Sequence, residues 1–219
     1  MKEQQAVLDF FAQPENLPLG LAVAEQMDTL RECMNTQFWQ ALQQQIANMV
    51  AKHALPWQVT ATEDKNAAEH AAVSLVGLYC AMPVGQELYL RPMMEQQNLG
   101  GDWRIYFGLM WSAPPSPEHT SLPEIAALKD ALQQTGFKNN QNYLAWQWSK
   151  LHPRRQDFLL RYAQQPKALL DEAQALLQKL LLEQRDLIAT ANAALQAAPR
   201  SMAISLSQLR SKRGDHDHE

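Results

Sequence analysis

The sequence predicts an α+β fold in which a four-stranded antiparallel sheet packs against long N- and C-terminal helices. The first observation is strict alternation in residues 103–111, where every second residue is apolar. Such alternation is typical of a strand with one face in a core. The second observation is that two long stretches repeat apolar residues every three or four positions, as amphipathic helices do. The residues that alternate are Trp103, Ile105, Phe107, Leu109 and Trp111.

Four segments are predicted to form the sheet: residues 57–62, residues 73–82, and two strands within residues 87–112. Their connections are short, and a parallel pair would need a crossover of about a dozen residues or more. An antiparallel meander is therefore expected. Gly100 and Gly101 supply the backbone freedom for the last turn.

The long helices are expected at residues 22–53 and 166–198, and a short helix is expected at residues 3–12. Pro14 and Pro18 are predicted to end the short helix, because proline interrupts helical hydrogen bonding.

Between the sheet and the last helix, the sequence predicts only helices. A helix is expected from Ser121, which has capping-box spacing to Glu124, to Gly136. Two short helical segments are then predicted at residues 143–151 and 153–164. The expected organisation is residues 1–112 for the N-terminal helices and sheet, residues 113–198 for a helical part packing on that sheet, and residues 199–219 for a flexible tail.

Composition excludes several classes of protein. The 219 residues are 46% apolar and carry a formal net charge of −4, so disorder throughout the chain and a uniformly basic surface are excluded. The apolar runs are too short for a membrane span, and the acidic N-terminus does not resemble a signal peptide. A cytoplasmic protein without a membrane partner is expected. Cys33 and Cys80 lie in apolar contexts and are predicted to be buried free thiols.

The sequence gives no catalytic signature, and neither a cofactor nor a metal is expected. Glu63 and Lys65 form an E-x-K after a strand, but no strand-borne aspartate precedes them to complete an Mg²⁺ site. His216 and His218 lie at the end of the predicted tail, where metal binding would be adventitious. These observations favour a non-enzymatic protein.

A basic and aromatic patch in residues 138–161 is the candidate site for nucleic acid or for a partner. Basic groups pair with phosphates, and aromatic rings stack on unpaired bases. The alternative is a core tryptophan beside a solvated helix end. On a helix, the i, i+2 spacing would put the two tryptophans of this patch on different faces. Its members are Lys138, Tyr143, Trp146, Trp148, Lys150, Arg154, Arg155 and Arg161.

The last helix carries two parallel apolar lines, which is wider than a two-helix seam needs. One line is expected to meet the N-terminal long helix. The other line is expected to pack against a protein partner or a second copy of the chain. The alternatives are the sheet and the helices of residues 121–164. This line consists of Leu170, Leu177 and Leu181.

Three segments resemble the accessory region that follows the catalytic core in some bacterial PD-(D/E)XK-nuclease-like proteins, several of them linked to phage defence. They are residues 35–42 (NTQFWQAL), the pair 88–90 (LYL) and 103–108 (WRIYFG), and an aromatic helix at 143–148. The nuclease core is absent here, so the resemblance implies a recognition module and transfers no catalytic residue. The expected function is an interaction or regulatory module acting with a partner protein in such defence. Nucleic-acid binding through the 138–161 patch and a degenerate nuclease are the alternatives.

Overall fold

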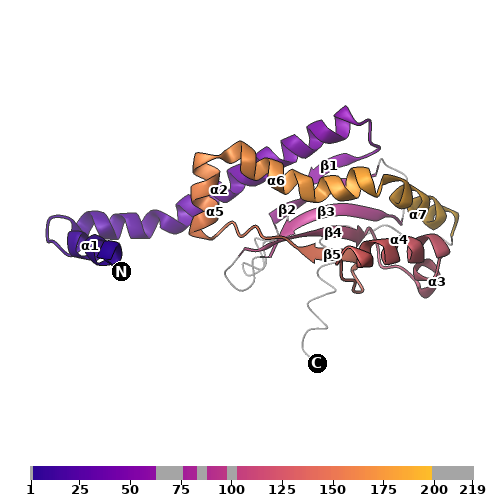
Figure 1. The fold of residues 1–219 in the computed structure, drawn as a ribbon, viewed down its shortest axis with the longest axis horizontal. Coiled ribbons are helices and arrows are strands. Elements are labelled where there is room, and N and C mark those ends of the chain that lie inside the picture. The colour runs from indigo at the N-terminus through magenta and orange to yellow at the C-terminus, as the bar shows by residue number, and fades with distance from the viewer. Residues whose placement is uncertain (1, 63–75, 83–87, 98–102, 199–219) are drawn as a thin grey trace, which may run out of the picture. The chain divides into compact units, whose positions relative to one another are not determined.

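The computed structural model describes residues 2–62, 76–82, 88–97 and 103–198 (Figure 1). The chain divides into two compact units, Met1–Gln37 and Phe38–Glu219. The boundary falls within helix α2 (Leu17–Lys52). In the described part of the chain, no helix combines the length and hydropathy that a membrane span requires.

The N-terminal unit, Met1–Gln37, consists of α1 (Lys2–Phe11) and the first part of α2. The prediction that Pro18 ends the first helix is wrong, because Pro18 lies in the first turn of α2. A missing N–H costs little at that position. The ring of Phe11 packs against Gly20, where an added Cβ would lie 2.9 Å from Phe11 Cδ1. Gly20 is therefore what allows this close contact.

The sheet belongs to the second unit and has five antiparallel strands in the order β1-β2-β3-β4-β5. The strands are β1 (Gln58–Ala61), β2 (Val76–Ala81), β3 (Leu90–Gln96), β4 (Ile105–Trp111) and β5 (Tyr143–Trp148). The α+β class and the antiparallel meander are confirmed. The predicted number of four strands is one too few.

The fifth strand is the segment that was predicted to be helical at residues 143–151. β5 pairs with β4, and Gly108 lies opposite Trp146. A Cβ at Gly108 would lie 2.1 Å from the carbonyl oxygen of Ala145, so glycine is needed for the two backbones to pair this closely. Tyr and Trp fit a pleated, half-buried surface well, and pairing with β4 overrides the short helical pattern.

The remaining helices are α3 (Pro117–Thr120), α4 (Pro123–Gln134), α5 (Gln156–Gln164), α6 (Pro166–Gln178) and α7 (Arg185–Ala197). Gly136 has φ +90° after α4, which confirms it as the residue that ends this helix. The predicted Ser121 cap is wrong, because Leu122 caps α4 without a side-chain hydrogen bond. A capping box instead joins Ser116 and His119 at α3.

The predicted single C-terminal helix is interrupted by a π-helical turn, η1 (Lys179–Glu183), between α6 and α7. Figure 1 shows α6, α7 and the C-terminal part of α2 on the same side of the sheet. The side chains of β4 that alternate toward these helices are all buried in the main core: Ile105, Phe107, Leu109 and Trp111. Trp103 departs from the prediction, because it precedes β4, adopts φ +49° and is partly exposed.

The same core contains the apolar line of the last helix that was expected to form a partner interface. Leu177 is fully buried and Leu181 is 1% exposed, while Leu170 is partly buried against the same core. Their apolar surface is satisfied within the chain, so the structure gives no support to an interface along this line.

Buried polar groups join the helices to the sheet. Asn192 of α7 accepts a hydrogen bond from the Leu90 amide at 2.7 Å and donates one to the Leu90 carbonyl at 3.3 Å. Trp39 of α2 donates to Gln96 of β3 at 3.1 Å. Buried polar groups cost free energy when they lack a partner, so these pairs favour one placement of α2 and α7 on β3.

The two cysteines have different environments, and both are free. Cys80 is buried in the main core, as predicted, whereas Cys33 is exposed on α2, so its predicted burial is wrong.

Candidate binding site on the second face of the sheet

The second face of the sheet, opposite the main core, carries a separate cluster of aromatic and methionine side chains. Its members come from β2, β3, β4 and β5, at positions that alternate with core residues. Four are buried and three are partly buried. The cluster consists of Met93, Tyr106, Met110 and Tyr143, with Tyr79, Trp146 and Trp148 packed against them.

Trp146 and Trp148 lie together on this face, and the expectation that they occupy different faces is wrong. On a strand, residues i and i+2 share a face, whereas on a helix they diverge. The two ring centroids are 5.6 Å apart, and both rings contact Tyr106 edge-on, at 6.4 Å and 5.5 Å. Both indoles are partly exposed.

A basic side chain lies against each of these indole rings. The Lys138 ammonium lies 5.9 Å from the centroid of the Trp146 ring, and the Arg104 guanidinium lies 5.0 Å from that of Trp148. A hydrogen bond holds the Arg104 guanidinium, because its Nε donates to the Ser149 carbonyl at 3.1 Å. Lys138 exchanges backbone hydrogen bonds with Trp146, which fixes its main chain beside that residue. We call Arg104, Tyr106, Lys138, Trp146 and Trp148 the aromatic–basic cluster.

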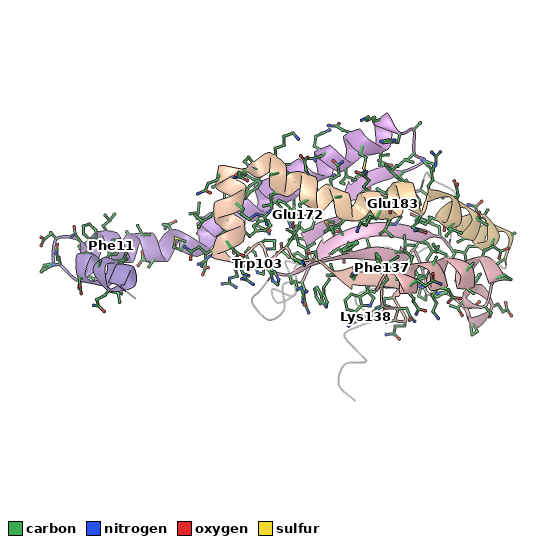
Figure 2. The ribbon with its side chains drawn as sticks, in the orientation of Figure 1. Phe11, Trp103, Phe137, Lys138, Glu172 and Glu183 are labelled. Atoms are coloured by element: carbon green, nitrogen blue, oxygen red, sulfur yellow. The ribbon has the colours of Figure 1, made fainter. Side chains whose placement is uncertain are left out.

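A third pair of this kind lies where the chain enters β4. The Arg154 guanidinium is 5.4 Å from the centroid of the Trp103 ring. Lys138 and Trp103 are labelled in Figure 2, Lys138 near β5 and Trp103 near the end of the sheet.

The other basic residues of the predicted patch do not join this cluster. Arg155 pairs with Asp157 at 3.2 Å, and Arg161 of α5 pairs with Glu172 of α6. Lys150 is exposed and lines a groove on the helical side. The 138–161 patch is therefore not one surface: Lys138, Tyr143, Trp146 and Trp148 lie together, Arg154 lies against Trp103, and the other three basic residues lie elsewhere.

That groove has a volume of about 370 Å³ and lies beside η1. Phe107 and Phe137 form part of its apolar wall, while Glu172 and Glu183 contribute carboxylates (Figure 2). Glu172 is already paired with Arg161.

A hydrogen-bonded group of polar side chains is buried beneath the aromatic rings. The Tyr106 hydroxyl donates to Glu95 Oε2 at 2.6 Å, and the Tyr143 hydroxyl lies 3.3 Å from that of Tyr106. Thr62 approaches the other carboxylate oxygen at 3.5 Å. Glu95 has no exposed surface. Because Glu95 engages the Tyr106 hydroxyl, this ring is fixed below the two indoles.

Arg91 of β3 is a buried cation on the same face. Its guanidinium lies 5.5 Å from the Tyr79 ring centroid and 5.2 Å from that of Tyr89, and it donates to the Ser112 carbonyl at 2.8 Å. Burial lowers the pKa of Arg91 from its usual value, while the neighbouring Tyr89 and Tyr79 act in the opposite direction. Arginine remains a cation at neutral pH, so it adds a fixed positive charge.

Within the described ranges, no group of three or more His, Cys, Asp or Glu side chains is placed to hold a metal ion. Glu63, Lys65, His216 and His218 lie outside those ranges.

Comparisons with protein-family models, with curated proteins and with solved structures found no match for this chain.

The sequence prediction missed most of the residues of this face that lie outside β5, among them Arg91, Glu95, Arg104 and Tyr106. The first two occupy the positions of β3 that alternate with core residues, so polar side chains within an otherwise apolar strand were the available signal. Arg104 could not be assigned in this way, because its role depends on Trp148, 44 residues later.

Proposed function

We propose that the protein is a non-enzymatic binding module and that its aromatic–basic cluster binds single-stranded nucleic acid. The observation that carries the proposal is the placement of Trp146 and Trp148 on one face of β5, each with its own cation. This arrangement offers rings and positive charges side by side.

The chemistry of a single strand fits such a surface. Unpaired bases stack on aromatic rings or on guanidinium planes, and stacking contributes about 1–3 kcal/mol per base. Lys138 and Arg104 would pair with the flanking phosphates, which gives a salt-dependent term. The cluster presents few groups for reading base edges, so we expect weak sequence preference.

Fluorescence anisotropy with a labelled, mixed-sequence DNA strand of about 20 nucleotides tests this proposal, with the matching RNA as a second probe. Replacing Trp148 by Ala should weaken binding roughly 5- to 100-fold, because one stacking contact is lost. Lys138→Gln should weaken it less, through loss of one phosphate contact.

Arg161→Gln is the matched control, since it removes an equal charge from an ion pair on the helical side. It should leave affinity near that of the unmodified protein. Absence of binding at low salt, or equal losses in Lys138→Gln and Arg161→Gln, would contradict the proposal. Circular dichroism would establish that each variant is folded.

A second candidate function is binding to a partner protein, which was the first expectation from the sequence. The observation that favours it is the N-terminal unit, in which eight large apolar side chains are 46–63% exposed. Surfaces of this kind mark interaction sites. A role in phage defence rests only on the resemblance of residues 35–42, 88–90, 103–108 and 143–148.

This second function can be tested by affinity capture from the native host, comparing the unmodified protein with Leu8→Glu. Leu8 is 63% exposed, so the substitution should not unfold the chain. Loss of a specific partner in the variant would support the N-terminal unit as the interface. If Leu8→Glu retained every partner, the N-terminal unit would be rejected as the interface.

A further inference from the structure

The N-terminal unit exposes apolar side chains on more than one side of α2. At 100° per residue, Leu17 and Leu21 lie on one side of the helix, and Leu19 and Val23 lie on the other. All four are 46–57% exposed. A helix that is apolar on several sides is normally buried. Val7, Leu8 and Phe10 of α1 and Leu30 of α2 extend this surface.

The same unit is strongly acidic. Its sequence contains two basic residues, Lys2 and Arg31, and six acidic residues, so its formal net charge is −4. Arg31 is already paired with Asp28 at 2.8 Å. The acidic residues are Glu3, Asp9, Glu15, Glu25, Asp28 and Glu32. The surface therefore fits an occupant that is both apolar and basic.

Residues 200–213 of the chain have this composition. They contain four basic residues and no acidic residue, which gives a charge of +4 against the −4 of the N-terminal unit. They also contain four large apolar residues. The basic residues are Arg200, Arg210, Lys212 and Arg213, and the apolar residues are Met202, Ile204, Leu206 and Leu209.

We propose that residues 200–213 of one copy bind the N-terminal unit of a second copy. The inference rests on the second candidate function, in which this unit is an interface, and it names the occupant. Complementary charge favours the correct pairing and opposes the pairing of two N-terminal units, each of which is negative.

Charge and composition name residues 200–213 as the occupant of this surface. The experiments below separate binding between two copies from binding within one copy.

Light scattering of the full chain over a concentration series tests the inference. We expect the mass to rise from that of one chain, 24.8 kDa, toward that of two or more. A chain that ends at Ala198 should stay monomeric. A chain that lacks only residues 214–219 is the matched control and should associate as the full chain does.

A labelled peptide of residues 200–213 provides the second measurement. It should bind the chain that ends at Ala198, and Leu19→Glu/Leu21→Glu in that chain should abolish binding. Reversing the charges of Arg210, Lys212 and Arg213 in the peptide should weaken it on the order of tenfold or more at low salt.

Three results would overturn the inference in distinguishable ways. A full chain that is monomeric at every concentration, together with a peptide that does not bind, removes the docking of residues 200–213. A monomeric full chain that excludes the peptide, while the shortened chain binds it, shows binding within one copy. Association that survives loss of residues 199–219 but is lost in Leu19→Glu/Leu21→Glu keeps the interface and rejects this occupant.

Discussion

The two faces of the sheet are built from the same strands but have different chemistry. Toward the helices, β4 presents Ile105, Phe107, Leu109 and Trp111, all of them core side chains. On the second face, the alternate residues are Tyr106 and Met110, beside partly exposed indoles and their cations. One strand can therefore supply stability with one set of alternate residues and a binding surface with the other.

The largest contrast that the comparison predicts concerns thiol reactivity. Cys80 faces the main core, and burial raises its pKa to about 12, so at pH 8 it stays a protonated thiol. Only the thiolate reacts, so Cys80 should react about a thousandfold more slowly than an ordinary thiol. A disulfide reagent should modify one cysteine per native chain, Cys33, and two after denaturation. Rapid modification of both cysteines in the native chain would show that the reagent reaches Cys80, and that the core between the helices and the sheet is not closed to solvent.

The next largest effect is on stability, at Phe107. This side chain is 3% exposed and packs edge-on against Phe137, with ring centroids 5.5 Å apart. Phe107→Ala should lower the free energy of unfolding by about 3–5 kcal/mol, because a cavity replaces the ring. Denaturant unfolding measures this loss. An unfolding curve unchanged from that of the unmodified protein would mean that this face is not core.

A smaller loss is expected on the second face at Tyr106. Tyr106→Phe keeps the ring but removes the hydroxyl that donates to buried Glu95. The expected cost is about 1–3 kcal/mol in denaturant unfolding. A loss as large as that of Phe107→Ala would erase the distinction between the faces, since it would make this face equally important for stability.

The helical face could be predicted from the sequence because its signal is local. Period-two alternation in residues 105–111 fixes which side chains share a face, and short connections make the neighbouring strands antiparallel. The π-turn at η1 was not predictable in this way. It interrupts a continuous apolar pattern with no proline or glycine to mark it.

The second face depended on a strand that the sequence assigned to a helix. Residues 143–148 are short enough for either structure, and the choice reversed the relation between Trp146 and Trp148. Turn-forming Asn139, Asn140 and Asn142 before an aromatic-rich segment were the available sign of a strand. The pairing that decides the matter involves Gly108, more than 30 residues earlier, and is a tertiary contact.

The smallest expected effect on stability belongs to Lys138, which is exposed. Lys138→Gln should change the free energy of unfolding by no more than about 0.5 kcal/mol. The binding surface can therefore be altered without altering the fold, and denaturant unfolding checks this. A loss of several kcal/mol would assign Lys138 to the structure and not to binding.

The central claim is that the aromatic–basic cluster contacts the phosphates of a single strand, and the salt dependence of binding tests it most directly. The slope of log affinity against log salt should become shallower by about 0.7 in Lys138→Gln, the contribution of one phosphate on a single strand. It should stay unchanged in Arg161→Gln, whose side chain pairs with Glu172. Binding whose slope is the same in the unmodified protein and in Lys138→Gln would contradict the claim.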